Sequence, residues 1–162
     1  MFVGEQPGDR EDREGHPFVG PAGKLLRDAM DAAGIDPAHV YITNAVKHFK
    51  FVERGKRRIH AKPKRTEVLA CEPWLIAEIA AVRPQLVVAL GATAAGALLG
   101  PAFRLTQHRG ELVASPHAAR VVATVHPSSI LRARDDEARH AEMAAFVPDL
   151  EAVASLMRQG SP

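Results

Sequence analysis

Cysteine is nearly absent from this chain: its 162 residues include one, Cys71. A single thiol excludes an internal disulfide, and nothing else in the sequence favours an oxidising compartment. The chain also lacks a basic and then apolar leader, and it begins directly in residues typical of a buried strand. These absences argue against secretion, so we expect a cytoplasmic protein.

Long hydrophobic runs are missing as well. The most apolar stretch, Leu86–Phe103, has 18 residues and no charged side chain, but three glycines and a proline interrupt it. It is therefore a poor candidate for a membrane span, and two core elements joined by a glycine turn fit it better. The whole chain is 46% hydrophobic and 25% charged. This composition is typical of one folded domain covering residues 1–162, which we expect to be a monomer.

Positive charge gathers in one segment of the chain. Between Lys47 and Arg65 there are nine Lys or Arg residues and one acid, Glu53, whereas the rest of the chain has 12 basic and 18 acidic residues. The formal net charge of +2 conceals this asymmetry. Concentrated positive charge is typical of a protein that binds a polyanion, and nucleic acid is the first candidate. On charge alone, a solvated loop is an equal alternative.

Apolar strands alternate with helical patterns along the sequence. Strands are expected at Met1–Gly4, Val40–Thr43, Leu86–Leu90 and Arg120–Val125. Helices are expected from Pro21 to Gly34, from an N-cap at Thr66 to Pro84, over Thr93–Leu99 and over about 137–157. The second helix has an apolar stripe of Val68, Leu69, Trp74, Leu75, Ile79 and Val82. This alternation predicts an α/β domain with a parallel four-stranded sheet flanked by helices.

Three polar segments follow the ends of expected strands: residues 4–20, 44–65 and 126–132. We expect the second of them, the basic segment, to be a long loop. Because loops at the carboxyl ends of parallel strands gather into the ligand crevice of such sheets, the three segments predict one common site.

Three residues in these segments are suited to binding a nucleobase. His126 follows a strand and precedes Pro127, which suits a fixed hydrogen-bond donor or general acid, although a structural histidine is the alternative. Asn44 also ends a strand, and its amide offers both a donor and an acceptor to a base edge. Phe18 stands between Pro17 and Gly20, either as a core residue or as a platform on which a base stacks.

His60 stands at the end of the basic run Lys56-Arg57-Arg58-Ile59-His60. Neighbouring cations favour the neutral imidazole, which is a nucleophile. From the residues alone, a generic contact to phosphate is the more common role for such a histidine.

Four motifs, taken in order, resemble the uracil-DNA glycosylase superfamily over essentially the whole chain. They are Gly4-Glu5-Gln6-Pro7-Gly8-Asp9, Gly15–Gly23, Thr43–Lys47 and His126-Pro127-Ser128. Each is weak alone, but the ordered set is specific. The run that ends at His60 resembles the UdgX-type branch, and so does Gln6, where iron–sulfur (family 4) members usually carry Ala. That branch becomes covalently joined to the DNA from which it removes uracil.

The resemblance implies a role for each matching residue. Phe18 would stack on a flipped uracil, Asn44 would bind its Watson–Crick edge, and His126 would donate to its carbonyl. Glu5, with Gln6 and Asp9, would line the sugar side, and His60 would capture the anomeric carbon. The remaining uracil or DNA contacts would come from Gly4, Pro7, Gly8, Lys56, Arg57, Arg58, Ser128 and Arg132. The implied partner is uracil-containing DNA, preferably single-stranded, and the implied location is at the nucleoid.

The resemblance also implies a [4Fe–4S] cluster held by cysteines, two of which lie before the first strand in iron–sulfur members. This chain begins at that strand and offers Cys71, together with His48 where the family usually has a cysteine. We therefore expect either an N-terminally shortened form or a protein without a cluster.

Two alternatives to a self-linking glycosylase stay open at this point. One is a conventional turnover uracil-DNA glycosylase of the iron–sulfur type, in which the basic segment only grips phosphate. The other is a DNA-binding module without catalytic activity.

Overall fold

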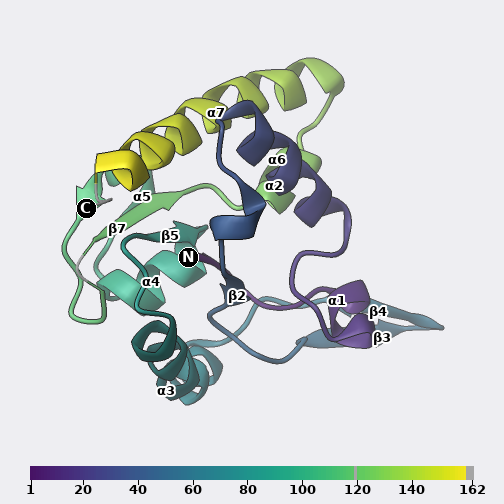
Figure 1. The fold of residues 1–162 in the computed structure, drawn as a ribbon. Helices are drawn as coiled ribbons and strands as arrows, with labels where there is room; N and C mark the ends of the chain where they lie inside the picture. Colours follow the sequence, from purple (N-terminus) through teal and green to yellow (C-terminus); the bar gives the residue numbers. More distant parts are fainter. Residues whose placement is uncertain (119, 160–162) are drawn as a thin grey trace.

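Five strands form the central sheet in the computed structural model, which describes residues 1–118 and 120–159 (Figure 1). The order across the sheet is β2 (Ile42–Asn44), β1 (Phe2–Gly4), β5 (Val87–Leu90), β7 (Val121–Thr124) and β6 (Leu112–Val113). The first four are parallel, which confirms the expected strands and fold class. The two-residue β6 pairs antiparallel with β7 and is a fifth strand that the sequence analysis did not predict.

Strand residues alternate between two apolar layers. Phe2 and Val88 face a core cluster that includes Leu26 of one helix and Phe146 of another. Val3 and its neighbours on the other face pack against a second cluster, built from helices on the opposite side of the sheet. Because the strands are apolar on both faces, the sheet is stable only between two helical layers.

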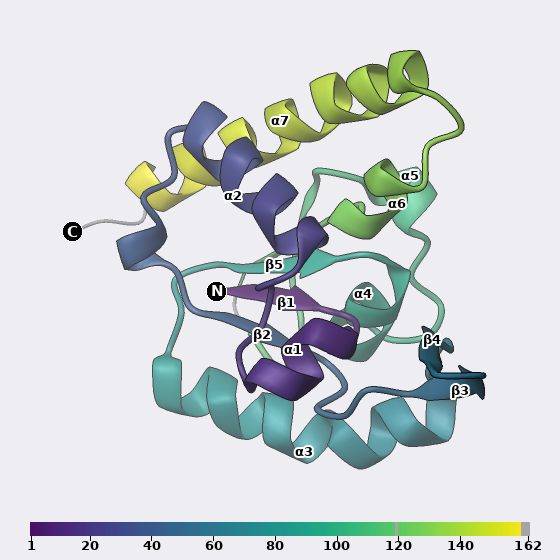
Figure 2. The ribbon, with the colours of Figure 1, turned by 90° about the vertical axis from the view of Figure 1, so that its right-hand side faces the viewer.

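The helices α2 (Pro21–Ala32) and α7 (Asp136–Gln159) cover one face of the sheet, and α3 (Arg65–Val82) and α4 (Ala92–Leu99) cover the other (Figure 2). Short elements complete the chain: α1 (Asp9–Glu14), a 3₁₀ turn (Pro37–His39), α5 (Leu105–His108) and α6 (Pro127–Leu131). None of the helices in the described residues has the length and apolarity needed to cross a membrane.

Several predicted elements need correction. The polar loop after β1 contains the helix α1, and α3 begins one residue before the expected N-cap, with Lys64 at its N-cap. Pro21 does begin α2, as predicted from its fixed φ angle. The basic segment is not a loop: it forms the antiparallel hairpin β3 (Phe51–Arg54) and β4 (Arg57–His60).

The predicted apolar stripe of α3 is only partly buried. Leu75 and Ile79 pack in the core, but Trp74 is 68% exposed and Leu69 is 46% exposed. The helix is apolar nearly all round its circumference, so periodicity does not indicate which side faces the sheet.

Candidate active site

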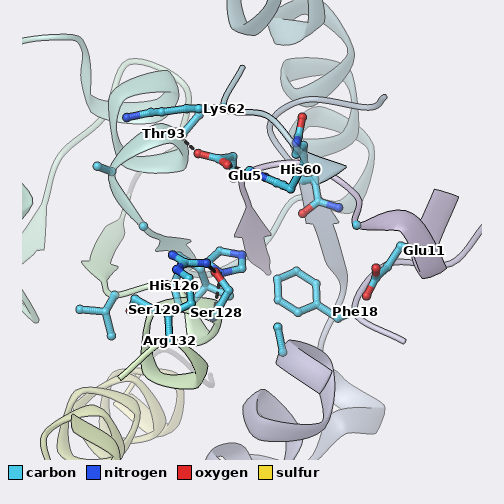
Figure 3. Close-up of a pocket in the computed structure, with 18 of the residues that line it drawn as sticks. Glu5, Glu11, Phe18, His60, Lys62, Thr93, His126, Ser128, Ser129 and Arg132 are labelled. Atoms are coloured by element: carbon cyan, nitrogen blue, oxygen red, sulfur yellow. Dashed lines mark hydrogen bonds and ion pairs between the residues drawn. The ribbon is translucent and has the colours of Figure 1, made fainter. Parts of the chain in front are cut away.

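A cavity of about 520 Å³ opens at the carboxyl ends of the parallel strands (Figure 3). Its walls come from the segments after β1, β2, β5 and β7 and from the end of the hairpin. The predicted site residues that line it are Glu5, Gln6, Gly8, Phe18, Asn44, His60, His126, Ser128 and Arg132. The structure thus brings together residues from all three polar segments at the sheet edge where parallel strands place ligands.

Phe18 lies in the cavity wall in a backbone conformation that few residues other than glycine adopt. Its φ is +54°, the residue is only 5% exposed, and its ring stacks on His126 with 5.6 Å between centroids. Arg27 Nη1 donates to the Phe18 carbonyl oxygen at 2.9 Å and helps hold the turn. Strained residues of this kind persist only where the surroundings fix them, and they cluster at functional sites.

Asn44 presents an unpaired acceptor to the cavity. The residue is 6% exposed, and its Oδ1 atom is buried without a hydrogen-bond donor among the described residues. Lys47 Nζ donates to the Asn44 backbone oxygen at 2.7 Å and fixes this strand end. A Cβ at Gly4 would lie against Asn44 Oδ1 and 2.7 Å from the Phe18 ring, so glycine is needed there. A buried acceptor without a donor costs about 1–3 kcal/mol, which a ligand N–H group would recover.

The tautomer of His126 is set by its neighbour. Its Nδ1 atom accepts a hydrogen bond from the Ser128 backbone N–H at 3.1 Å and lies 2.8 Å from Ser128 Oγ. The neutral ring therefore carries its proton on Nε2. Burial lowers the pKa of His126 to about 4, so the ring is neutral at physiological pH. Arg132 Nη1 donates to Ser128 Oγ at 3.0 Å and supports the same arrangement.

The side chains of Glu5 and His60 are in contact inside the cavity. Glu5 Oε1 lies 3.2 Å from His60 Nε2, and the other carboxylate oxygen accepts a hydrogen bond from Thr93 Oγ1 (Figure 3). The His60 side chain is about half exposed, at 52%, which leaves it accessible to a ligand in the cavity. A carboxylate and an accessible imidazole in contact form a pair that can exchange a proton.

Gln6 fastens the base of the hairpin rather than pointing a free amide at a ligand. Its Nε2 atom donates to the backbone oxygens of Lys50 and Ala61, at 3.2 and 3.1 Å, and its Oε1 atom accepts from Lys50 N at 3.1 Å. These residues flank β3 and β4, so Gln6 sets the position of His60, the last residue of β4.

Arg58 fastens the same hairpin from its other side. It pairs with Asp9 at 2.5 Å and with Asp12 at 2.7 Å on α1. Its guanidinium also lies over the rings of Phe49 and Phe51, at 5.3 and 4.9 Å. The charges of Arg58 and Asp9 are thus engaged within the protein, and neither residue lines the cavity.

Lys56 and Arg57 lie at the exposed tip of the hairpin, outside the cavity. Neither has an ion pair with another described residue, so both cations are accessible to a polyanion. Pro7 also lies outside the cavity lining and borders a smaller neighbouring hollow.

Most of the chain matches a known family. The family described as the uracil DNA glycosylase superfamily matches residues 1–151. The chain belongs to that superfamily. It is 36% identical over 160 residues to a type-4 uracil-DNA glycosylase of Thermotoga maritima, covering 98% of this chain and 78% of that protein. A type-4 uracil-DNA glycosylase of Pyrobaculum aerophilum is 36% identical over 139 residues, 82% of this chain and 67% of that protein. A type-5 uracil-DNA glycosylase of the same organism is 40% identical over 100 residues, 60% of this chain and 40% of its own length.

The donor atoms in the described part of this chain do not fit an iron–sulfur cluster. Cys71 is buried on α3, and its Sγ atom accepts a hydrogen bond from the Lys47 backbone N–H at 3.4 Å, whereas His48 is exposed. In residues 1–118 and 120–159, no group of three or more His, Cys, Asp or Glu side chains is placed to hold a metal. Two candidate ligands do not suffice for a cluster that needs four.

Thr93 and Glu11 are among the residues of the glycosylase cavity that the sequence analysis of the site missed. Thr93 follows β5, a fourth strand that ends at the same edge, but its turn was interpreted only as a link between core elements. Glu11 lines the cavity from α1, and its carboxylate accepts a hydrogen bond from Gly20 N at 2.8 Å. The signal for Thr93 was its place two residues beyond Gly91 at a strand end.

Proposed function

We propose that this protein removes uracil from DNA, in DNA repair, and that His60 then bonds covalently to the abasic sugar. The observation that carries the proposal is the contact between His60 Nε2 and Glu5 Oε1 at 3.2 Å, inside the cavity that also holds Phe18, Asn44 and His126. A nucleophile and a proton acceptor thereby lie beside groups suited to binding a planar base. This assignment places the chain in the UdgX-type branch of the superfamily.

Uracil satisfies the unpaired group in the cavity. Its N3–H group is a donor for the buried Oδ1 of Asn44, and its O4 atom is an acceptor for the amide N–H of the same side chain. In the orientation that the structure gives the Asn44 amide, cytosine would place its N3 acceptor against Oδ1 and its N4 donor against the amide N–H group, and an unpaired buried group costs about 1–3 kcal/mol. The Phe18 ring, held in place by its strained backbone, supplies the face on which the base stacks.

His126 acts on the departing base. When the bond between C1′ and N1 breaks, its electron pair stays with uracil, and negative charge develops on the ring oxygens. The neutral His126 ring keeps its proton on Nε2 because Ser128 occupies Nδ1. It therefore donates a hydrogen bond to this charge while remaining neutral itself, as a preorganised donor in a buried site does.

The covalent step uses His60 and Glu5. Loss of uracil leaves an oxocarbenium-like centre at C1′. One ring nitrogen of neutral His60 gives its lone pair to C1′, and the other nitrogen loses its proton to the Glu5 carboxylate. The uracil anion takes up a proton from solvent. The products are free uracil and a C–N bond between His60 and the abasic sugar.

The DNA strand is proposed to run along the hairpin. Lys56 and Arg57 are exposed at its tip, and His60 at its base lines the cavity. A single strand fits this arrangement because its bases need no unpairing before one enters the cavity.

The conventional turnover reaction is the second candidate, favoured by the names of the relatives, which are type-4 and type-5 uracil-DNA glycosylases. In that case water takes the place of His60 at C1′, and the protein dissociates from abasic DNA.

The test is to incubate the protein with a uracil-containing single strand and to separate the products under heat and denaturant. We expect an adduct with the wild-type protein and none with His60→Ser, which retains the hairpin cations. His140→Ser, at an exposed histidine of α7, is the matched control and should form the adduct normally. Free abasic product without adduct from the wild type would favour turnover. Retention of intact uracil DNA would favour a binding module. An adduct formed by His60→Ser would mean that another residue is the nucleophile.

A further inference from the structure

Thr93 holds the Glu5 carboxylate on the side away from His60. Glu5 follows β1, and Thr93 lies in the first turn of α4, which follows β5. These two strands are neighbours in the sheet, so their ends place the two side chains together. Thr93 Oγ1 donates to Glu5 Oε2, and Glu5 Oε1 contacts His60 Nε2 (Figure 3). Each carboxylate oxygen thus has one partner in the described part of the chain.

The Thr93 hydroxyl is not needed to build its own helix. The N-cap of α4 is Gly91, and no side chain caps the helix. Threonine near a helix start often uses its hydroxyl for capping, but here the donor goes to a residue 88 positions away in the sequence. The hydrogen bond therefore orients a side chain of the cavity and does not cap the helix.

We propose that Thr93 is a positioning residue for the covalent step. This inference rests on the proposed function of Glu5 and His60. A carboxylate side chain held at one oxygen loses its freedom to rotate, so Oε1 stays against the His60 ring during the attack on C1′. Without the Thr93 hydroxyl, Glu5 turns away for part of the time, and His60 loses both its orientation and its proton acceptor.

Loss of the Thr93 hydroxyl should change how the sugar intermediate is partitioned between His60 and water. Water competes with His60 for C1′, and only the reaction with His60 depends on the orientation that Thr93 supports. Thr93→Val keeps the shape of the side chain and removes the donor. We expect it to slow adduct formation at least tenfold and to raise the share of abasic DNA that is not cross-linked. Thr93→Ser keeps the donor and should stay within twofold of the wild type.

The experiment is a single-turnover assay with protein in excess over a uracil-containing single strand. Denaturing gels measure the adduct, and alkali treatment reveals abasic DNA that is not cross-linked. Thr106→Val on α5 is the matched control, because this exposed threonine lies outside the cavity. Affinity for a uracil-free strand and the thermal unfolding midpoint are measured for every variant, and we expect both to match the wild type.

A second arm tests whether Thr93 acts through Glu5. In a Glu5→Ala background, followed over long incubations, adding Thr93→Val should change the adduct rate by less than twofold, because the side chain that Thr93 holds is gone. Effects of the two substitutions that multiply would overturn the inference. So would a Thr93→Val protein that forms adduct at the wild-type rate, or one that loses adduct, abasic product and DNA affinity in equal proportion.

The wild-type reaction distinguishes failure of this inference from failure of the proposed function. If the wild type forms adduct and Thr93→Val matches it, only the role of Thr93 is wrong. If the wild type forms no adduct, the covalent function is overturned, and the role of Thr93 falls with it.

Discussion

Replacing Gln6 with alanine is predicted to separate uracil release from covalent capture. Gln6 is 7% exposed, and its side chain makes three hydrogen bonds to the residues that flank the hairpin, Lys50 and Ala61. Alanine removes all three. Since each such bond contributes a net of about 0.5–1.5 kcal/mol, attachment of the hairpin should weaken by about 2–4 kcal/mol.

Loss of these hydrogen bonds should displace His60 and leave the base-binding groups in place. Phe18, Asn44 and His126 make no side-chain bond to Gln6, so uracil release should continue. Without the hydrogen bonds from Gln6, the hairpin should hold His60 at the cavity for a smaller fraction of the time. Adduct formation should therefore fall by at least tenfold.

The assay compares adduct and free uracil from one reaction, and hydrogen exchange follows the hairpin directly. The amides of Lys50 and Ala61 should exchange faster in Gln6→Ala, because Lys50 N loses its acceptor and the Ala61–Lys50 backbone bond at 2.9 Å loses its support. Gln107→Ala, at an exposed glutamine of α5, is the matched control. Adduct formation at the wild-type rate, with faster exchange at these amides, would refute the reasoning that the hairpin's attachment limits capture.

Three further predictions address the base site and the hairpin tip. Asn44→Asp places a carboxylate, which only accepts, against a uracil carbonyl, so excision should fall by orders of magnitude in a uracil-release assay, and undiminished excision would remove Asn44 from base recognition. Burial lowers the pKa of His126 from 6.5 to about 4, so the unfolded chain binds this proton more readily and stability should fall as pH drops below 6.5. The loss should be about 2 kcal/mol by pH 5 and absent from His126→Gln in urea unfolding, and parallel pH profiles for the two proteins would contradict this account. Replacing Lys56 and Arg57 with alanine should reduce the slope of log affinity against log salt by about 0.7 per lost phosphate contact on single-stranded DNA, without changing the preference for uracil over thymine, whereas an unchanged slope would mean that the tip is merely solvated.

Local signals predicted the sheet and the place of the site. The strand Val87–Leu90 is apolar on both faces, so its burial between two helical layers follows from composition alone. Pro21 and the glycine-rich segment before it marked the start of α2 in the same way. Because carboxyl ends of parallel strands share one edge, Asn44 and His126 could be assigned to a common cavity before any contact was known.

Long-range contacts stabilise the hairpin, which the sequence analysis interpreted as a loop. Its strands, Phe51–Arg54 and Arg57–His60, are rich in charge and lack a clear alternating pattern. An isolated two-stranded hairpin is only marginally stable in water. Here Arg58 ties it to the carboxylates of α1, and Gln6 fastens its base. No local sequence pattern predicts a strand that is stabilised by partners more than 40 residues away in the sequence.

The sequence by itself determined which residue types are present and which strand ends carry them. Only the tertiary structure decided their partners: it turned Arg58 toward two acids, left Trp74 of an apolar helix exposed, and placed Thr93 against Glu5. The physical reason is that periodicity and turn chemistry act over a few residues, whereas the direction of a side chain in a folded site depends on groups that packing brings from distant parts of the chain.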